Sequence, residues 1–203
     1  MSYLNREDRR AMILNAAKEL VLKEGILALT ARKLSTYAQV SVGQIHHHFS
    51  SLIALKTEVF LSLMDHINDI NRLSQTDDWQ EKLYLLLGLG NPEALKPYLK
   101  IYNEVLVLMD KDEAYKVAFG LATQRWHDSL THLIHEGQEQ GAIQVDPNKN
   151  IADIAWRLIA LIVGLDSLLS LNNYSKTAAL AISQDNANRY IEQLIAYEFT
   201  DLE

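Results

Sequence analysis

The sequence predicts an all-α protein: a three-helix N-terminal domain followed by a larger helical bundle. Only three prolines and eight glycines interrupt the 203 residues, and apolar residues recur at helical spacings of three and four almost throughout. No strand is expected. A chain of this length buries about 70% of its unfolded surface, so it needs no disulfide or metal to hold its core. The absence of cysteine excludes a disulfide scaffold and a thiolate site, and favours a reducing cytoplasm.

The first 50 residues are predicted to form three helices. The first runs from Arg6 to Lys23, and Gly25 ends it. Two short helices are expected over 31–37 and 42–48, where Thr30 and Ser41 stand in the N-cap positions. The domain boundary is placed here, giving domains 1–50 and 51–203.

The body is predicted to contain helices that begin at residue 50 or 51, at the capping pair Asp78 and Glu81, and then over 97–109, 112–136, 150–171 and 184–198. The helix over 150–171 is apolar most of the way round, which indicates burial on two sides. A second copy of the chain is favoured as the second covering surface, although the central helix of a monomeric bundle remains an alternative. The expected homodimer contacts are Ile159, Val163, Tyr190 and Leu194.

The net charge of −7 is unevenly divided along the chain. Residues 1–60 hold eight Lys or Arg and five Asp or Glu, a net charge of +3, which leaves −10 for the remainder. Phosphate binding by the N-terminal part alone would require this distribution, with basic residues at the N-terminus and an acidic remainder. The net charge of +3 is nevertheless modest.

Residues 30–55 carry the most specific pattern in the sequence. Apolar residues at 34, 38, 40, 45 and 49 are spaced to pack two short helices together, which leaves the start of the second helix exposed. This is the geometry of a recognition helix in the major groove. The segment resembles the helix-turn-helix of the TetR family of regulators, matching its pattern at Thr30, Leu34, Ser35, Ala38, Val40, Ser41, Gly43, Ile45, His48, Phe49, Ser51 and Leu55.

The resemblance implies that the chain binds operator DNA. It places base contacts at Arg32, Val42, Gly43 and Gln44, and backbone contacts at Thr30, His46, His47 and His48. Two of these have structural alternatives: Gln44 has capping-box spacing from Ser41, and Arg32 could be a solvated helix charge. The sequence departs from the family at Gln39, at His46 and at Leu52, where a phosphate-anchoring Lys is usual. Lys56, one turn further on, is the candidate replacement.

The run His46-His47-His48 is not expected to bind metal. Successive side chains on a helix point about 100° apart, so three adjacent imidazoles cannot converge on one ion. If two of them face phosphate, DNA affinity should rise as pH falls through about 6.5.

The segment from Pro97 onward resembles the C-terminal domain of the BetI branch of the same family, with Gly137 and Gly141 in one loop and Gly164-Leu165 in an apolar helix. That resemblance implies a small-molecule effector bound between body helices. Candidate pocket residues are Tyr98, Tyr102, Arg125, Trp126, Trp156 and Asp166.

We therefore expect a ligand-responsive regulator, a repressor released from operator DNA by its effector, whose dimer places two recognition helices about 34–36 Å apart. No cofactor, catalytic motif or metal site is predicted. The polar N-terminus and the short longest apolar run argue against a signal peptide or a membrane segment, so a cytoplasmic location is expected. The alternatives are a helical interaction module that does not bind DNA and, less favoured, a helical-bundle enzyme.

Overall fold

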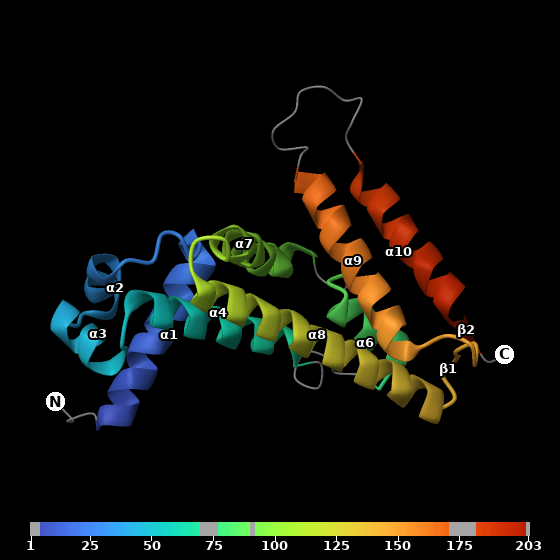
Figure 1. Ribbon diagram of the computed structural model, residues 1–203, viewed down its shortest axis with the longest axis horizontal. Helices are drawn as coiled ribbons and strands as arrows, with labels where there is room; N and C mark the ends of the chain where they lie inside the picture. Colours follow the sequence, from blue (N-terminus) through green and yellow to red (C-terminus); the bar gives the residue numbers. More distant parts are fainter. Residues whose placement is uncertain (1–4, 70–76, 90–91, 171–181, 202–203) are drawn as a thin grey trace. The chain divides into compact units, whose positions relative to one another are not determined.

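A computed structural model of the chain describes residues 5–69, 77–89, 92–170 and 182–201 (Figure 1). It confirms the predicted all-helical class. The helices are α1 (Arg6–Glu24), α2 (Ala31–Ala38), α3 (Val42–His48), α4 (Leu52–Asn68), α6 (Trp79–Leu86), α7 (Pro92–Leu108), α8 (Glu113–Glu139), α9 (Ile151–Ser170) and α10 (Gln184–Glu198).

Two features differ from the sequence-based expectation. Two short strands, β1 (Ile143–Gln144) and β2 (Thr200–Asp201), pair antiparallel although no strand was expected. Helix α7 begins at Pro92, so Pro97 lies inside it rather than in its first turn. Proline suits a first helical position because its missing N–H has no partner there, and Pro92 already provides that start. The predicted final residue of α9, Leu171, lies outside the described residues.

The chain divides into two compact units, residues 1–67 with 93–124 and residues 68–92 with 125–203. The first unit contains α1 to α4, α7 and the beginning of α8. The second contains α6, the remainder of α8, α9 and α10. These units do not follow the predicted boundary after residue 50, because the apolar stripe of α4 packs in the same core as α1.

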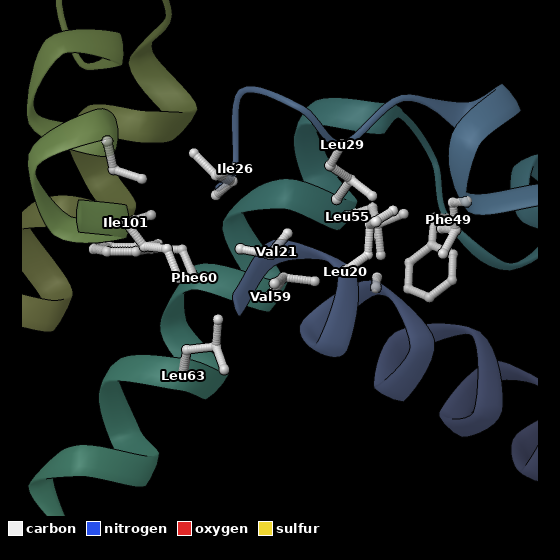
Figure 2. Close-up of a cluster of buried hydrophobic side chains, with 14 of the residues drawn as sticks. Leu20, Val21, Ile26, Leu29, Phe49, Leu55, Val59, Phe60, Leu63 and Ile101 are labelled. Atoms are coloured by element: carbon white, nitrogen blue, oxygen red, sulfur yellow. The ribbon is translucent and has the colours of Figure 1, made fainter. Parts of the chain in front are cut away.

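The core of the first unit joins the three N-terminal helices to α4 and α7. Figure 2 shows Leu20 and Val21 of α1 facing Val59 and Phe60 of α4, with Ile101 of α7 beside them. All five side chains are at most 1% exposed. Burial of this kind contributes roughly 1.5–3 kcal/mol for each large side chain, so α1 and α4 are held in one rigid core.

A carboxylate on α7 fixes the segment between α1 and α2. Glu104 Oε2 accepts hydrogen bonds from the backbone N–H of Ile26 at 2.6 Å and of Leu27 at 3.1 Å. Gly25 precedes them with φ of 94°, a region that L side chains rarely adopt, and a Cβ there would overlap the Glu104 carboxylate. The sequence prediction that Gly25 ends the first helix is confirmed, and the direction in which the chain enters α2 is set from α7.

The core of the second unit is built around Trp79 of α6. Its indole N–H donates to the carbonyl oxygen of Leu133 at 2.6 Å, and Phe199 meets the ring edge-on at a centroid distance of 5.4 Å. Figure 1 shows α9 and α10 side by side in this unit. The apolar faces of both helices contribute to the same core.

A buried ion cluster joins the end of α10 to α9. The Glu198 carboxylate is fully buried and accepts two hydrogen bonds from Arg157, at 2.6 and 3.0 Å, while Lys149 Nζ lies 3.1 Å away. Burial alone would raise the pKa of Glu198, but Arg157 and Lys149 together hold it below its ordinary value. Arg157 is thus paired with Glu198 inside its own unit.

Gly137 was expected in a loop but lies inside α8, where it provides a test of the second core. A Cβ at this position would lie within the Trp79 indole, so we expect Gly137→Ala to lower the free energy of unfolding by about 1–3 kcal/mol. Gly120→Ala is the matched control on the same helix, because its Cβ would meet no atom within 4 Å. The control should be unchanged or more stable, since alanine favours helix by about 1 kcal/mol. Equal stability of the two variants in denaturant titrations would contradict this packing.

Candidate nucleic-acid interface

Local side-chain chemistry defines the ends of α2 and α3. Thr30 Oγ1 accepts from the Lys33 N–H at 3.2 Å and so caps α2. Gln39 has left-handed backbone (φ 53°) and turns the chain between the helices. Ser41 then caps α3 through its hydroxyl, which accepts from the Gln44 N–H at 3.2 Å. The predicted helix-turn-helix is confirmed, and Gln39 occupies the turn conformation that glycine adopts more readily.

The second short helix is fixed from behind and open in front. Ile45 is 2% exposed and Phe49 4% exposed, and both pack in the core of the first unit. On the opposite side, Val42 is 38% exposed although it is apolar. The other predicted contact residues that are exposed are Thr30, Arg32, Gly43, Gln44, His46 and His47, whereas His48 is half-buried.

Gln44 takes part in a capping box. Its side-chain Oε1 accepts from the Ser41 N–H at 3.2 Å, reciprocating the bond from its own N–H to the Ser41 hydroxyl. The capping alternative is therefore the one that the free protein adopts. A base contact from Gln44 requires this side chain to leave Ser41, and the Ser41 hydroxyl bond can still cap the helix when it does.

Gly43 has no internal reason to be glycine. Its backbone is helical, and a Cβ there would have only the Ser41 hydroxyl within 4 Å, at 3.8 Å. Glycine in a helix costs about 0.5–1 kcal/mol relative to alanine. The absent side chain instead leaves the front of α3 open to close approach by another molecule.

The residues expected to anchor phosphate on α4 lie in a different environment. Leu52 is half-buried and packs against the core of the first unit. Lys56 is also half-buried; burial lowers its pKa, and Glu104 acts in the opposite direction. The structure thus associates Lys56 with Glu104 of α7 and does not group it with the exposed residues of α3.

His48 lies in a positive field at the end of α3. Its Nδ1 is buried and has no hydrogen-bond partner in the described part of the chain. Burial, followed by the charges of His47, Arg6, Arg10 and Arg9, holds the pKa of His48 below its ordinary value. The predicted pH response is therefore displaced downwards for this histidine.

We expect DNA affinity to rise several-fold as pH falls below about 6.5, because nearby phosphate stabilises the protonated form of His48. Protonation of His48 also costs folding stability, since its folded-state pKa lies below the unfolded value, and this cost appears only below about pH 6.5. Affinity measured from pH 5 to 8, with the melting temperature checked at each pH, tests this expectation. If His48→Gln retains the full rise below pH 6.5, His48 is not its source.

The candidate pocket residues are divided between the two units. In the first, Tyr98 stacks on His66 at a centroid distance of 6.2 Å, and the Tyr102 hydroxyl is 3.1 Å from Thr123 Oγ1. Tyr102 also contacts Phe119 at 4.6 Å, and its burial raises the pKa of its hydroxyl. These tyrosines therefore form part of an aromatic cluster on α7, α8 and the end of α4.

The remaining pocket candidates lie in the second unit. The Trp126 indole N–H donates to the Leu86 carbonyl oxygen at 3.0 Å. Trp156 stacks on His127 at 4.4 Å and remains 42% exposed. Arg125 is exposed and Asp166 half-buried. Trp156 thus belongs to the outer face of α9, a placement that helical periodicity did not distinguish from a pocket wall.

The predicted dimer residues are placed unequally. Ile159 is 4% exposed and packs in the core of its own unit, so it does not lie on the outer face of α9. Val163 and Leu194 are half-buried, and Tyr190 is 41% exposed. Three further positions on α9 and α10 that the sequence prediction did not include are exposed: Gly164, Leu168 and Tyr197.

A sequence model described as bacterial regulatory proteins, tetR family, matches residues 13–59, which run from within α1, through α2 and α3, to the first half of α4. The model covers 47 of the 203 residues, and these include the whole helix-turn-helix. This segment is similar to the N-terminal domain of tetR-family regulatory proteins. The fit covers the capped α2 and α3 together with the helices that hold them in place.

Solved structures of transcription regulators share the fold over nearly the whole chain. A transcriptional regulator from Saccharomonospora viridis, solved in complex with choline, is 21% identical, with 97% of this chain and 100% of that chain covered and a TM-score of 0.68. A TetR-family regulator from Rhodococcus sp. is 22% identical over 95% and 98% of the chains (TM-score 0.69). A TetR regulator from Haloarcula marismortui is 17% identical over 96% and 100% (TM-score 0.72).

No curated protein sequence matches this chain. Within the described part of the chain, no helix has both the length and the apolar character that crossing a bilayer requires.

Proposed function

We propose that this protein is a regulator of the TetR family that represses transcription by binding a near-palindromic operator as a homodimer, and that a small molecule releases it. The observation that carries the proposal is the geometry of α3. Its back is fixed by Ile45 and Phe49, while Val42, Gly43 and Gln44 are exposed at its N-terminal end, the end that enters the major groove in helix-turn-helix proteins.

The proposed DNA contacts follow from this placement. Val42, Gly43 and Gln44 meet base edges, joined by Arg32 from α2. Thr30 and the exposed His46 and His47 meet the backbone, together with His48 once it is protonated. Lys56 is the weakest of the candidates because it is half-buried beside Glu104.

Arg32 provides the direct test of base recognition. We expect Arg32→Ala to weaken operator binding by about 1–3 kcal/mol per half-site and to relax preference at one base pair, because arginine pairs bidentately with guanine. Lys33→Ala is the neighbouring control, since Lys33 is held by an ion pair with Glu24. Competition binding with single-base operator variants measures both effects. An unchanged base preference in Arg32→Ala means that Arg32 is a solvated charge.

The homodimer is proposed to form through the outer faces of α9 and α10. Four large apolar or aromatic side chains are exposed there, Trp156 and Leu168 on α9 and Tyr190 and Tyr197 on α10. Exposed side chains of this kind on adjacent helices are typical of an interface. Val163 and Leu194 lie half-buried at the edge of the same surface.

The effector is proposed to be a small quaternary ammonium compound of the choline class, as the BetI-like layout of the body implies. Support comes from the choline complex of the Saccharomonospora viridis protein. Aromatic faces attract such cations, and each unit by itself contains candidates: Tyr98 and Tyr102 in the first, and Trp126 in the second. Asp166 is a candidate counter-charge. Choline chloride should raise the melting temperature above that in sodium chloride of equal ionic strength; equal melting in the two salts excludes choline.

Deletion of the gene tests repression in the cell. Transcription of the genes adjoining its own should rise on deletion and fall again when the wild-type gene is restored. A variant with Arg32→Ala should restore repression only in part. A fall in transcription on deletion would instead identify an activator.

A further inference from the structure

Three arginines near the start of α1 lie on the same side of the helix as its buried apolar residues. Arg6, Arg9 and Arg10 are spaced at i, i+3 and i+4, and the next position of that series is Ile13, which is fully buried. Glu7 and Asp8 point away from this arc, because successive residues of a helix are about 100° apart. The face that packs against the rest of the unit therefore changes from apolar to basic in the first turn of α1.

The first turn of α1 is fastened beside the end of α3. Asn5 caps the helix by accepting from the Asp8 N–H at 2.8 Å. Arg10 donates to Glu58 of α4 at 2.6 Å, and its guanidinium lies 4.7 Å from the centroid of the Phe49 ring, directly after α3. Arg10 is thus neutralised and structural, and it holds Arg6 and Arg9 near the junction of α3 and α4.

Arg6 and Arg9 differ from Arg10 in having no ion pair within the described residues. Arg6 is exposed and Arg9 half-buried. Both act electrostatically on His48, whose pKa they help to lower, so their charges are close to the C-terminal end of α3. Two uncompensated arginines and two histidines are thereby gathered at one edge of the recognition helix.

The start of α4 carries no exposed cation. Leu52 packs against the core of the first unit, and Lys56 is half-buried beside Glu104. A helix in the major groove is flanked by the phosphates of both strands, and cations at its edge meet them. Two arginines on one helix turn can bind two phosphates at once. A partner with regularly spaced negative charges therefore suits them better than a single carboxylate group does.

We propose that Arg6 and Arg9 of α1, with His47 and His48 of α3, form a phosphate-binding patch that supplies the positive charge which the start of α4 lacks. The patch binds the backbone of duplex DNA beside the groove that α3 enters. It contributes affinity and salt dependence, and it carries no base preference. The proposal rests on the proposed binding of operator DNA.

The test compares Arg6→Gln/Arg9→Gln with Lys18→Gln/Lys23→Gln, which removes the same charge from the same helix outside the patch. Binding to a labelled duplex from the region flanking the gene, and to a scrambled duplex, is measured over a series of salt concentrations. We expect the arginine pair to make the dependence of log affinity on log salt shallower by about 0.9 for each phosphate that the variant no longer neutralises. The ratio of affinities for the two duplexes should stay unchanged.

A second variant, Arg6→Lys/Arg9→Lys, keeps the charge and should retain most of the slope, and equal melting temperatures establish that the variants are folded. Equal effects of the arginine and lysine pairs would overturn the proposal, because a diffuse field would then account for both. An unchanged slope in the arginine pair, with wild-type binding intact, overturns the patch alone. Absence of duplex binding by the wild-type protein overturns the proposed function itself.

Discussion

Gly43→Ala is expected to weaken operator binding by about 1–3 kcal/mol per half-site, comparable with the removal of one base contact, while leaving the protein at least as stable. The two effects have opposite signs because they arise from different neighbours. Inside the protein, a Cβ at Gly43 has only the Ser41 hydroxyl within 4 Å, so alanine gains helix stability. Outside it, the added methyl group occupies the space between α3 and the groove.

The measurement pairs a duplex titration with thermal melting of the same samples. Gly120→Ala is the control, because this glycine of α8 is equally open and lies outside the recognition helix. It should show the gain in stability without the decrease in affinity. Full operator affinity in Gly43→Ala would mean that the front of α3 does not approach DNA closely.

Gly164→Glu is expected to dissociate the homodimer, raising its dissociation constant by about 100-fold or more. Within one chain the substitution is harmless, since a Cβ at Gly164 of α9 meets no atom within 4 Å. In a dimer formed through this face, the new carboxylate would be buried without a partner on both subunits. Unpaired buried charges cost about 3–5 kcal/mol, which corresponds to this change in affinity.

Gly164→Ala serves as the milder comparison, because it adds only a methyl group at the same place. Sedimentation equilibrium should give a dimer for the wild type and a monomer with native helix content for Gly164→Glu. Operator binding should weaken in parallel, since a monomer holds one recognition helix. A Gly164→Glu protein that remains dimeric would place the interface elsewhere on the chain.

The N-terminal helix-turn-helix could be predicted in detail because the residues that define it are close together in the sequence. Thr30 and Ser41 cap their helices through residues three positions away, and Gly25 acts through its own backbone. Interactions between residues only a few positions apart can be predicted from their spacing in the sequence. The proximity of Arg6 and Arg9 to His48 could not be predicted from the sequence, because it depends on how α1 packs against α3 and α4.

The body was predicted in outline and less well in detail. Helix α9 is apolar on two sides, and periodicity alone does not say which side faces the core, so Ile159 was assigned outward although it is buried. Its neighbour Trp156 is the exposed residue. The pairing of β1 with β2 joins Ile143 to Asp201 across the chain, a contact for which two-residue strands provide no sequence signal.

The most direct test of the central claim is a titration of the full-length protein with duplex DNA from the region flanking its own gene, at two or more salt concentrations. We predict saturable binding of one dimer per site, weakening steeply as salt rises, because each phosphate contact releases condensed counterions. Absence of salt-sensitive binding to this region and to any selected genomic fragment would contradict the account and favour a helical interaction module.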